Sequence, residues 1–225
     1  MTSNAEDSEY RILVIGKAGN GKSSVCNTLL GSEHFPTGRS FSSTTLEAQE
    51  VNCRRNGRCF KVVDTPDVVN LDLTLEDMEE EVSRWKDLTL PHPSAVLLTV
   101  RCDVRYTPEE YAIYRQILKL WGDDTLKRHL VVTFTFGDRQ DEDIRQTLQH
   151  VCPQLKSVLK DANGRFVVFD NKARDKDCQR RALFSLLDTD SSLGERHTSP
   201  AQQFAVAAVI ALLAYFVFTS LWMHN

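Results

Sequence analysis

The feature that most constrains this chain is a glycine-rich turn between an apolar run and a helical stretch. Residues 11–15 (RILVI) predict a buried strand, which leads directly into Gly16-Lys17-Ala18-Gly19-Asn20-Gly21-Lys22-Ser23 and a helix to about Leu30. These eight residues match GxxxxGK[ST] in the strand–turn–helix setting that the pattern requires. The glycines let successive backbone N–H groups converge, and with the helix N-terminus they form a cradle for phosphate oxygens. The pattern predicts a nucleoside di- or triphosphate site.

Three further features of the sequence predict how phosphate and metal are held. Lys22 is expected to reach the β- and γ-phosphates, and the Ser23 hydroxyl to bind Mg²⁺. Asp64 follows the apolar residues 60–63, and a carboxylate at that strand end can hold the same Mg²⁺ through its water shell. The hydroxyl-rich stretch 41–45 (FSSTT) lies where a loop would offer a threonine to the metal.

The rest of the chain alternates β-rich runs with helical periods. Strands are expected over residues 47–52, 59–64, 95–100, 130–136 and 165–169, and helices over 107–121 and 173–187. Asn56-Gly57 between two of these runs predicts a hairpin. We therefore expect an α/β fold of the P-loop NTPase class, with a mostly parallel sheet, helices on both faces and one antiparallel edge hairpin. Ligands bind such sheets at the carboxyl ends of the strands.

Composition excludes several other classes of protein. A length of 225 residues suits one α/β domain and a little more, and 41% hydrophobic residues are enough for a core. The net charge of −4 argues against a nucleic-acid binder, which would carry a basic excess. The six cysteines form no CxxC pair, which argues against zinc fingers and disulfide scaffolds. Residues 1–8 form a polar tail without the apolar core of a secretory signal peptide.

The C-terminal region has a different composition. Residues 204–222 carry no charge, and as a helix they would be about 28 Å long, close to the hydrocarbon thickness of a bilayer. We expect a transmembrane tail anchor behind a polar linker over 189–203, with the rest of the chain in the cytosol. A buried C-terminal core helix is the alternative. No lysine or arginine follows the span, which favours the endoplasmic reticulum or endomembranes over the mitochondrial outer membrane.

Several stretches together resemble one family. They are RILVIGKAGNGKSSVCNTLLG, DTP, PHPSA running on to RYTPEEYAIY, VVTFTFGDRQD and RFVVFDNK. They resemble the GIMAP proteins, the immunity-associated nucleotide-binding GTPases with an AIG1-type G domain, which belong with the septins and the chloroplast import GTPases. The resemblance covers about residues 9–188, and several members of the family also end in a hydrophobic anchor.

The resemblance implies a domain that binds GTP or GDP with Mg²⁺. Its phosphate loop would comprise Gly16, Lys17, Ala18, Gly19, Asn20, Gly21, Lys22, Ser23 and Ser24. Thr45 would join Ser23 and Asp64 at the metal as the switch-one threonine, and Thr37 would lie near the nucleotide. Thr135, Gly137 and Asp138 stand in for the guanine-specificity motif, in which the Asp138 carboxylate accepts the N1 and N2 hydrogens of guanine. Asp170 and Asn171 would lie beside the base.

The resemblance also implies a partner subunit. Arg105 falls in a family motif whose arginine acts on the phosphates across a dimer, so a homo- or hetero-oligomer formed through the G domain is expected. Asp67 stands where the family has the switch-two glycine, and residues 68–70 (VVN) include no glutamine to orient a water. A carboxylate near the γ-phosphate site repels GTP more than GDP, so we expect a preference for GDP.

Two functions of different kinds remain open from the sequence. One is a membrane-tethered, slow GTPase switch that dimerises and hydrolyses GTP with Arg105 in trans. The other is a nucleotide-gated membrane scaffold with little or no hydrolysis. An ATP-using kinase or ATPase is a more distant third, since the chain offers no obvious acceptor-site carboxylate.

Overall fold

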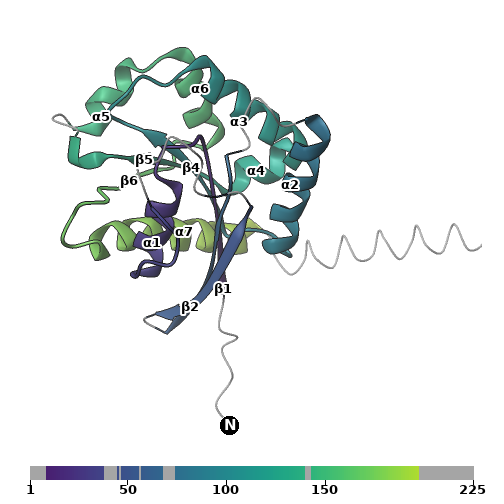
Figure 1. The fold of residues 1–225 in the computed structure, drawn as a ribbon. Helices are drawn as coiled ribbons and strands as arrows, with labels where there is room; N and C mark the ends of the chain where they lie inside the picture. Colours follow the sequence, from purple (N-terminus) through teal and green to yellow (C-terminus); the bar gives the residue numbers. More distant parts are fainter. Residues whose placement is uncertain are drawn as a thin grey trace, which may run out of the picture. The chain divides into compact units, whose positions relative to one another are not determined.

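The computed structural model describes residues 9–37, 45, 47–55, 57–67, 74–139 and 143–197, and describes side chains up to residue 188. It divides into a unit of residues 1–183 and a second of residues 184–225. The first unit contains a six-stranded sheet in the order β2-β3-β1-β4-β5-β6 (Figure 1). The strands are β1 Glu9–Ile15, β2 Gln49–Arg55, β3 Arg58–Asp64, β4 Ala95–Arg101, β5 Leu130–Thr135 and β6 Phe166–Val168.

Strand pairing follows the expected pattern. β2 and β3 pair antiparallel at one edge, and every other neighbouring pair of strands is parallel. Because the parallel strands end at the same edge, the loops after β1, β3, β4 and β5 are gathered there. The predicted edge hairpin is therefore confirmed, although Asn56 in its turn lies outside the described residues.

Helices cover both faces of the sheet. They are α1 Lys22–Leu30, α2 Leu75–Leu88, α3 Pro108–Trp121, α4 Asp123–His129, α5 Ile144–Thr147, α6 Pro153–Asp161 and α7 Asp177–His197, with 3-10 turns η1 Gly137–Arg139 and η2 Leu148–His150. Along β1 the buried side chains alternate between the two faces, so Leu13 and Ile15 join the cluster with α2, α3, α4 and α6. The α/β fold expected from the sequence is thus confirmed.

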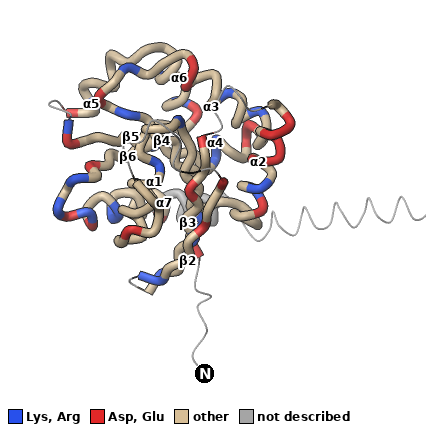
Figure 2. Tube along the Cα trace, in the orientation of Figure 1, with Lys and Arg blue, Asp and Glu red and all other residues tan. Residues whose placement is uncertain are grey.

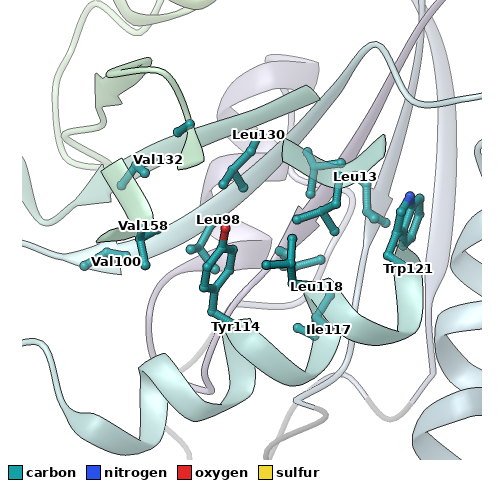
Figure 3. Packing of buried hydrophobic residues seen from close by; sticks show 14 of the residues in the cluster. Leu13, Leu98, Val100, Tyr114, Ile117, Leu118, Trp121, Leu130, Val132 and Val158 are labelled. Atoms are coloured by element: carbon teal, nitrogen blue, oxygen red, sulfur yellow. The ribbon is translucent and has the colours of Figure 1, made fainter. Parts of the chain in front are cut away.

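α3 is a helix whose start was clearly signalled in the sequence. α3 begins with a capping box in which the Thr107 hydroxyl accepts from the Glu110 backbone and the Glu110 carboxylate accepts from the Thr107 backbone. Tyr114, Ile117 and Leu118 are fully buried against β1, β4 and β5 (Figure 3). This packing fixes the N-terminus of α3 beside the strand ends.

The C-terminal part of the chain differs from the expectation in one region, and in another the expectation falls on residues that the structure does not describe. The last helix begins at Asp177 and continues to His197, into the stretch expected to be a linker. The reason is local: residues 188–197 contain one glycine and no proline to end a helix. Within the described ranges no helix is both long and apolar enough to cross a membrane, and residues 204–222 lie outside those ranges.

Candidate functional site

The loop between β1 and α1 has the conformation expected of a phosphate cradle. Gly16, Gly19 and Gly21 have φ angles of 139°, 78° and 84°, and residues that carry a Cβ rarely adopt such angles. At Gly16 a Cβ would also lie 2.3 Å from the Thr99 hydroxyl oxygen, so the close contact with β4 requires glycine. Ala18 and Gly19 form the exposed tip, and Lys17 is half-buried.

Lys22 lies folded over this loop. Its side chain is buried, and Nζ donates a hydrogen bond of 2.8 Å to the Gly16 carbonyl. Burial lowers the pKa of Lys22, and the charges of Asp67 and then Asp64 act in the opposite direction. An anionic phosphate would supply the charge partner that a buried ammonium needs.

The predicted metal-binding residues are brought together. The Asp64 carboxylate oxygen Oδ2 accepts hydrogen bonds from Ser23 Oγ at 2.6 Å and from Thr45 Oγ1 at 3.3 Å. Asp64 is fully buried, its Oδ1 has no hydrogen-bond partner, and burial raises its pKa. Two hydroxyls and a carboxylate with an unused oxygen are hard ligands of the kind Mg²⁺ prefers. The residues therefore fit Mg²⁺.

The phosphate loop is tied to the sheet and to α3 by contacts that the sequence did not predict. The Asn20 amide donates to the Thr99 carbonyl at 3.0 Å and to Glu110 Oε1 at 2.9 Å. The buried Thr135 hydroxyl donates to the Asn20 carbonyl at 2.8 Å. Asn20 and Thr135 thus brace the loop through their side chains. The capping-box spacing of Thr107 and Glu110 was the one sequence pattern that singled out Glu110.

A polar cavity of about 430 Å³ lies beside Ser24 of α1 and Asn171, and its lining includes none of the residues 16–23, 135, 137 and 138. Its lining includes Ser24, Thr37, Asn171 and the basic residues Arg55, Arg174, Lys176 and Arg180. Lys and Arg alternate with Asp along the segment before α7 (Figure 2). The buried Asn171 Oδ1 has no partner, and its amide nitrogen lies 3.5 Å from where a Cβ on Gly21 would be. An unsatisfied amide beside the phosphate loop suits a polar ligand such as a purine base.

Asp138 lies on the short turn η1, which follows β5. Its carboxylate pairs with Lys172 Nζ at 2.5 Å, and this hydrogen bond lowers the pKa of Asp138. The Asp170 carboxylate accepts from the Lys172 backbone at 2.8 Å, so Asp170 shapes the turn that carries Lys172. Gly137 packs close to β6, where an added Cβ would lie 2.9 Å from Val168. The contact between Lys172 and Asp138 was not predicted from the sequence.

Arg105 and Asp67 occupy different surroundings. Arg105 is exposed on the loop between β4 and α3, and it forms no hydrogen bond or ion pair with the described residues. Of the charged groups that raise the pKa of Lys22, the Asp67 carboxylate has the largest effect. It therefore lies near the ammonium that would hold the phosphates. Residues 68–70 lie outside the described residues.

Comparison with known proteins finds one matching family and several relatives. The AIG1 family profile matches residues 10–203. The chain is 33% identical over 198 residues to the Arabidopsis thaliana immune-associated nucleotide-binding protein 7, covering 83% of this chain and 63% of that protein. It is 28% identical over 193 residues to the human GTPase IMAP family member 8, covering 86% of this chain and 29% of that protein. The chain therefore spans less than two thirds of these relatives.

Solved structures share the fold at low sequence identity. Arabidopsis thaliana Toc33 in complex with GDP and Mg²⁺ aligns with a TM-score of 0.61 at 20% identity, covering 84% of this chain and 85% of that one. A structure described as showing that dimerisation is important for the GTPase activity of the chloroplast translocon components Toc33 and Toc159 aligns with a TM-score of 0.58 at 21% identity, covering 74% and 71%. These likenesses establish the fold.

Proposed function

The chain belongs to the AIG1 family and carries a G domain of that type; on that premise we propose that it is a membrane-tethered, slow GTPase switch that acts through dimerisation of its G domains. The observation that carries the nucleotide site is the buried Asp64 carboxylate, which joins Ser23 and Thr45 and keeps one oxygen unpaired. Together with Lys22 over the phosphate loop, it forms a site for a phosphate–Mg²⁺ pair.

The base-side residues support guanine over adenine. A carboxylate at Asp138 can accept two hydrogens from guanine, at N1 and at the exocyclic N2, and adenine has no donors at those positions. Asn171, with its unpaired Oδ1, lies on the phosphate-loop side of the cavity. To reach Asp138, guanine has to displace Lys172 or share the carboxylate with it. The exposed Lys172 makes this exchange inexpensive, because surface ion pairs contribute little.

Chemistry within this chain consists of positioning and charge stabilisation. Lys22 and the loop N–H groups hold the phosphates, and bound Mg²⁺ would offset the charge that develops on them. Ser23, Thr45 and Asp64 would hold that ion. Residues 68–70 contain no glutamine to orient the attacking water, and an arginine supplied in trans would add charge stabilisation at the phosphates. Arg105, exposed and unpaired within the described part of the chain, is available to a second copy.

The experiment that tests this function is single-turnover GTP hydrolysis at low and high protein concentration. We expect the rate per molecule to rise with concentration, and Arg105→Ala to remove most of that rise, because an arginine supplied in trans acts only in the dimer. Arg115→Ala, which changes an exposed arginine on α3, is the matched control. Equal rates at both concentrations would contradict catalysis in trans.

The nucleotide-gated scaffold is the alternative function. It is favoured by the presence of Asp67 where the family has the switch-two glycine. If the protein binds GTP but does not hydrolyse it at any protein concentration, the scaffold replaces the GTPase as the proposed function. The same assay therefore separates the two proposals.

Asp67 also gives a prediction on nucleotide preference. Its carboxylate lies near Lys22 and so near the phosphates, where two unit charges about 6 Å apart repel by roughly 2.8 kcal/mol at an effective dielectric of 20. The penalty is larger for GTP than for GDP. We expect the unaltered protein to prefer GDP and Asp67→Gly to raise the affinity for a non-hydrolysable GTP analogue relative to GDP by about tenfold, which is less than full repulsion because solvent and Mg²⁺ screen the charge. Calorimetric titration at fixed Mg²⁺ and salt measures the ratio, and an unchanged ratio would remove Asp67 as its cause.

The membrane tether is the remaining part of the proposal. It is supported by the uncharged residues 204–222, which are long enough as a helix to span a bilayer. In this arrangement the G domain faces the cytosol, with the endoplasmic reticulum or endomembranes as the site. A tether confines the chains to two dimensions, which raises their local concentration and favours dimerisation.

A further inference from the structure

The segment that carries Asp138, residues 135–139, runs from the last residue of β5 through η1 and has one internal backbone hydrogen bond, from Arg139 to the Phe136 carbonyl at 2.9 Å. The turn η1 is three residues long, and none of them is buried. Phe136, just before it, has a φ of 60°, a value that is sparsely populated for an aromatic residue. Such a conformation persists only when surrounding contacts hold it. The contacts that hold the Phe136 backbone in this conformation therefore come from other parts of the chain.

On one side the Gly137 backbone donates to the Phe169 carbonyl at 3.1 Å and Lys172 pairs with Asp138. On the other side the contacts come from the loop after β4, through Asp103. Its two carboxylate oxygens accept from Arg101 in a bidentate pair, at 2.9 Å from Nε and 2.8 Å from Nη2. The same carboxylate accepts from Arg139 Nη1 at 2.6 Å. The Asp103 side chain is only 9% exposed. Bidentate, charge-assisted pairs of this kind fix orientation as well as adding energy.

The Phe136 side chain contacts the guanidinium groups of the same two arginines. The Arg101 guanidinium lies 4.1 Å from the centre of the Phe136 ring, and the Arg139 guanidinium lies 4.9 Å from it. Cys102 adds a backbone hydrogen bond of 3.1 Å to the Thr135 carbonyl. Asp103 thus neutralises two guanidinium groups that would otherwise repel each other beside one ring.

We propose that Asp103 is a positioning residue for guanine recognition: by binding Arg139 and Arg101 it holds residues 135–139 so that the adjacent Asp138 faces the base. This inference rests on the proposed function. Hydrogen bonds from Arg101 hold the pKa of Asp103 at about 2, so the carboxylate stays charged at ordinary pH. Without that charge, Arg139 is released and Asp138, its direct neighbour, loses its fixed orientation.

The test is nucleotide specificity in the full 225-residue chain in detergent. Displacement of a fluorescent GDP by GDP, IDP and ADP gives three affinities for each variant. We expect Asp103→Asn to weaken GDP binding by about tenfold while ADP binding changes less than about twofold, because the phosphate loop is not altered. The ratio of the affinity for GDP to the affinity for IDP should fall as well, because it reports the hydrogen bond from the exocyclic N2 of guanine to Asp138. Asp103→Glu, which keeps the carboxylate, should retain most of the preference.

Two further variants make the result specific. Asp138→Ala should reproduce the Asp103→Asn pattern, because it removes the base reader itself. Asp124→Asn, which removes an exposed carboxylate on α4, should leave all three affinities unchanged. Equal weakening of GDP and ADP in Asp103→Asn would indicate a general structural role and overturn the proposal, as would an unchanged ratio. A failure of the unaltered protein to bind GDP would instead contradict the proposed function.

Discussion

Replacing Lys22 with alanine is expected to weaken the binding of both GDP and GTP by at least about 100-fold, which corresponds to about 2.7 kcal/mol. The Lys22 ammonium is buried at the mouth of the phosphate loop, where its neighbour in the structure is the Gly16 carbonyl. In that low-dielectric position a charge-assisted bond to phosphate is stronger than one at the surface. Lys17, the other lysine of the loop, is half-buried, and its side chain makes no hydrogen bond to the described residues; only its backbone carbonyl accepts one, from Asn20.

The fold should survive this change, and that can be measured independently. Burial penalises the charged form of Lys22, so removing the charge relieves a desolvation cost while it loses one hydrogen bond. Calorimetry should show the loss of nucleotide affinity, and a thermal melt should show that added GDP no longer raises the midpoint. Lys156→Ala, at an exposed position on α6, is the control. Normal GDP affinity in Lys22→Ala would contradict the phosphate-loop assignment.

Removing residues 204–225 is expected to move the protein from the membrane fraction to the supernatant almost completely. An uncharged helix of nineteen residues partitions strongly into lipid, and no comparable apolar run occurs elsewhere in the sequence. Fractionation followed by carbonate extraction of the membranes measures the change. The truncated chain should still bind GDP, since the residues assigned to the nucleotide site all lie before position 184.

A point substitution tests the same idea without truncation. Ala211→Arg places one charge near the centre of the span, at a cost of about 2.5–3.5 kcal/mol on insertion scales. It should therefore weaken anchoring, whereas Ala211→Leu should not. Retention of the truncated chain in the carbonate-resistant pellet would mean that another part of the protein holds the membrane.

Local sequence signals accounted for much of the fold. The alternation of apolar runs with helical periods predicted the strands, and the capping box at Thr107 predicted the start of α3. α2 has a capping box too, with Asp77 as its acid, and Met78, Val82, Trp85 and Leu88 recur at helical spacing against the core. These local signals were present, but α2 was not predicted. α7 extended past its expected end because neighbouring residues in a helix cooperate, and nothing in the sequence stops them.

The candidate site divides in the same way. Gly16 through Ser23 and Asp64 were identified because each stands at a strand end in a short pattern, and parallel strands bring those ends to one edge. The partners of Asn20 and Asp138 were not identified. Asn20 binds Glu110 across 90 positions, and Asp138 binds Lys172 across 34. No spacing rule links residues so far apart, because their distance depends on how helices pack on the sheet.

The sequence by itself determined that this chain has a phosphate loop, a strand-end carboxylate and an uncharged run of nineteen residues, since each feature is formed by neighbouring residues and follows from local chemistry. Tertiary structure alone decided how those pieces are held. The Asp103 carboxylate meets Arg139 because the parallel register of β4 and β5 brings the loops that follow them side by side. Charge, hydrogen-bonding capacity and helix or strand preference can be inferred from residue type, whereas the pairing of distant groups exists only after the sheet has formed.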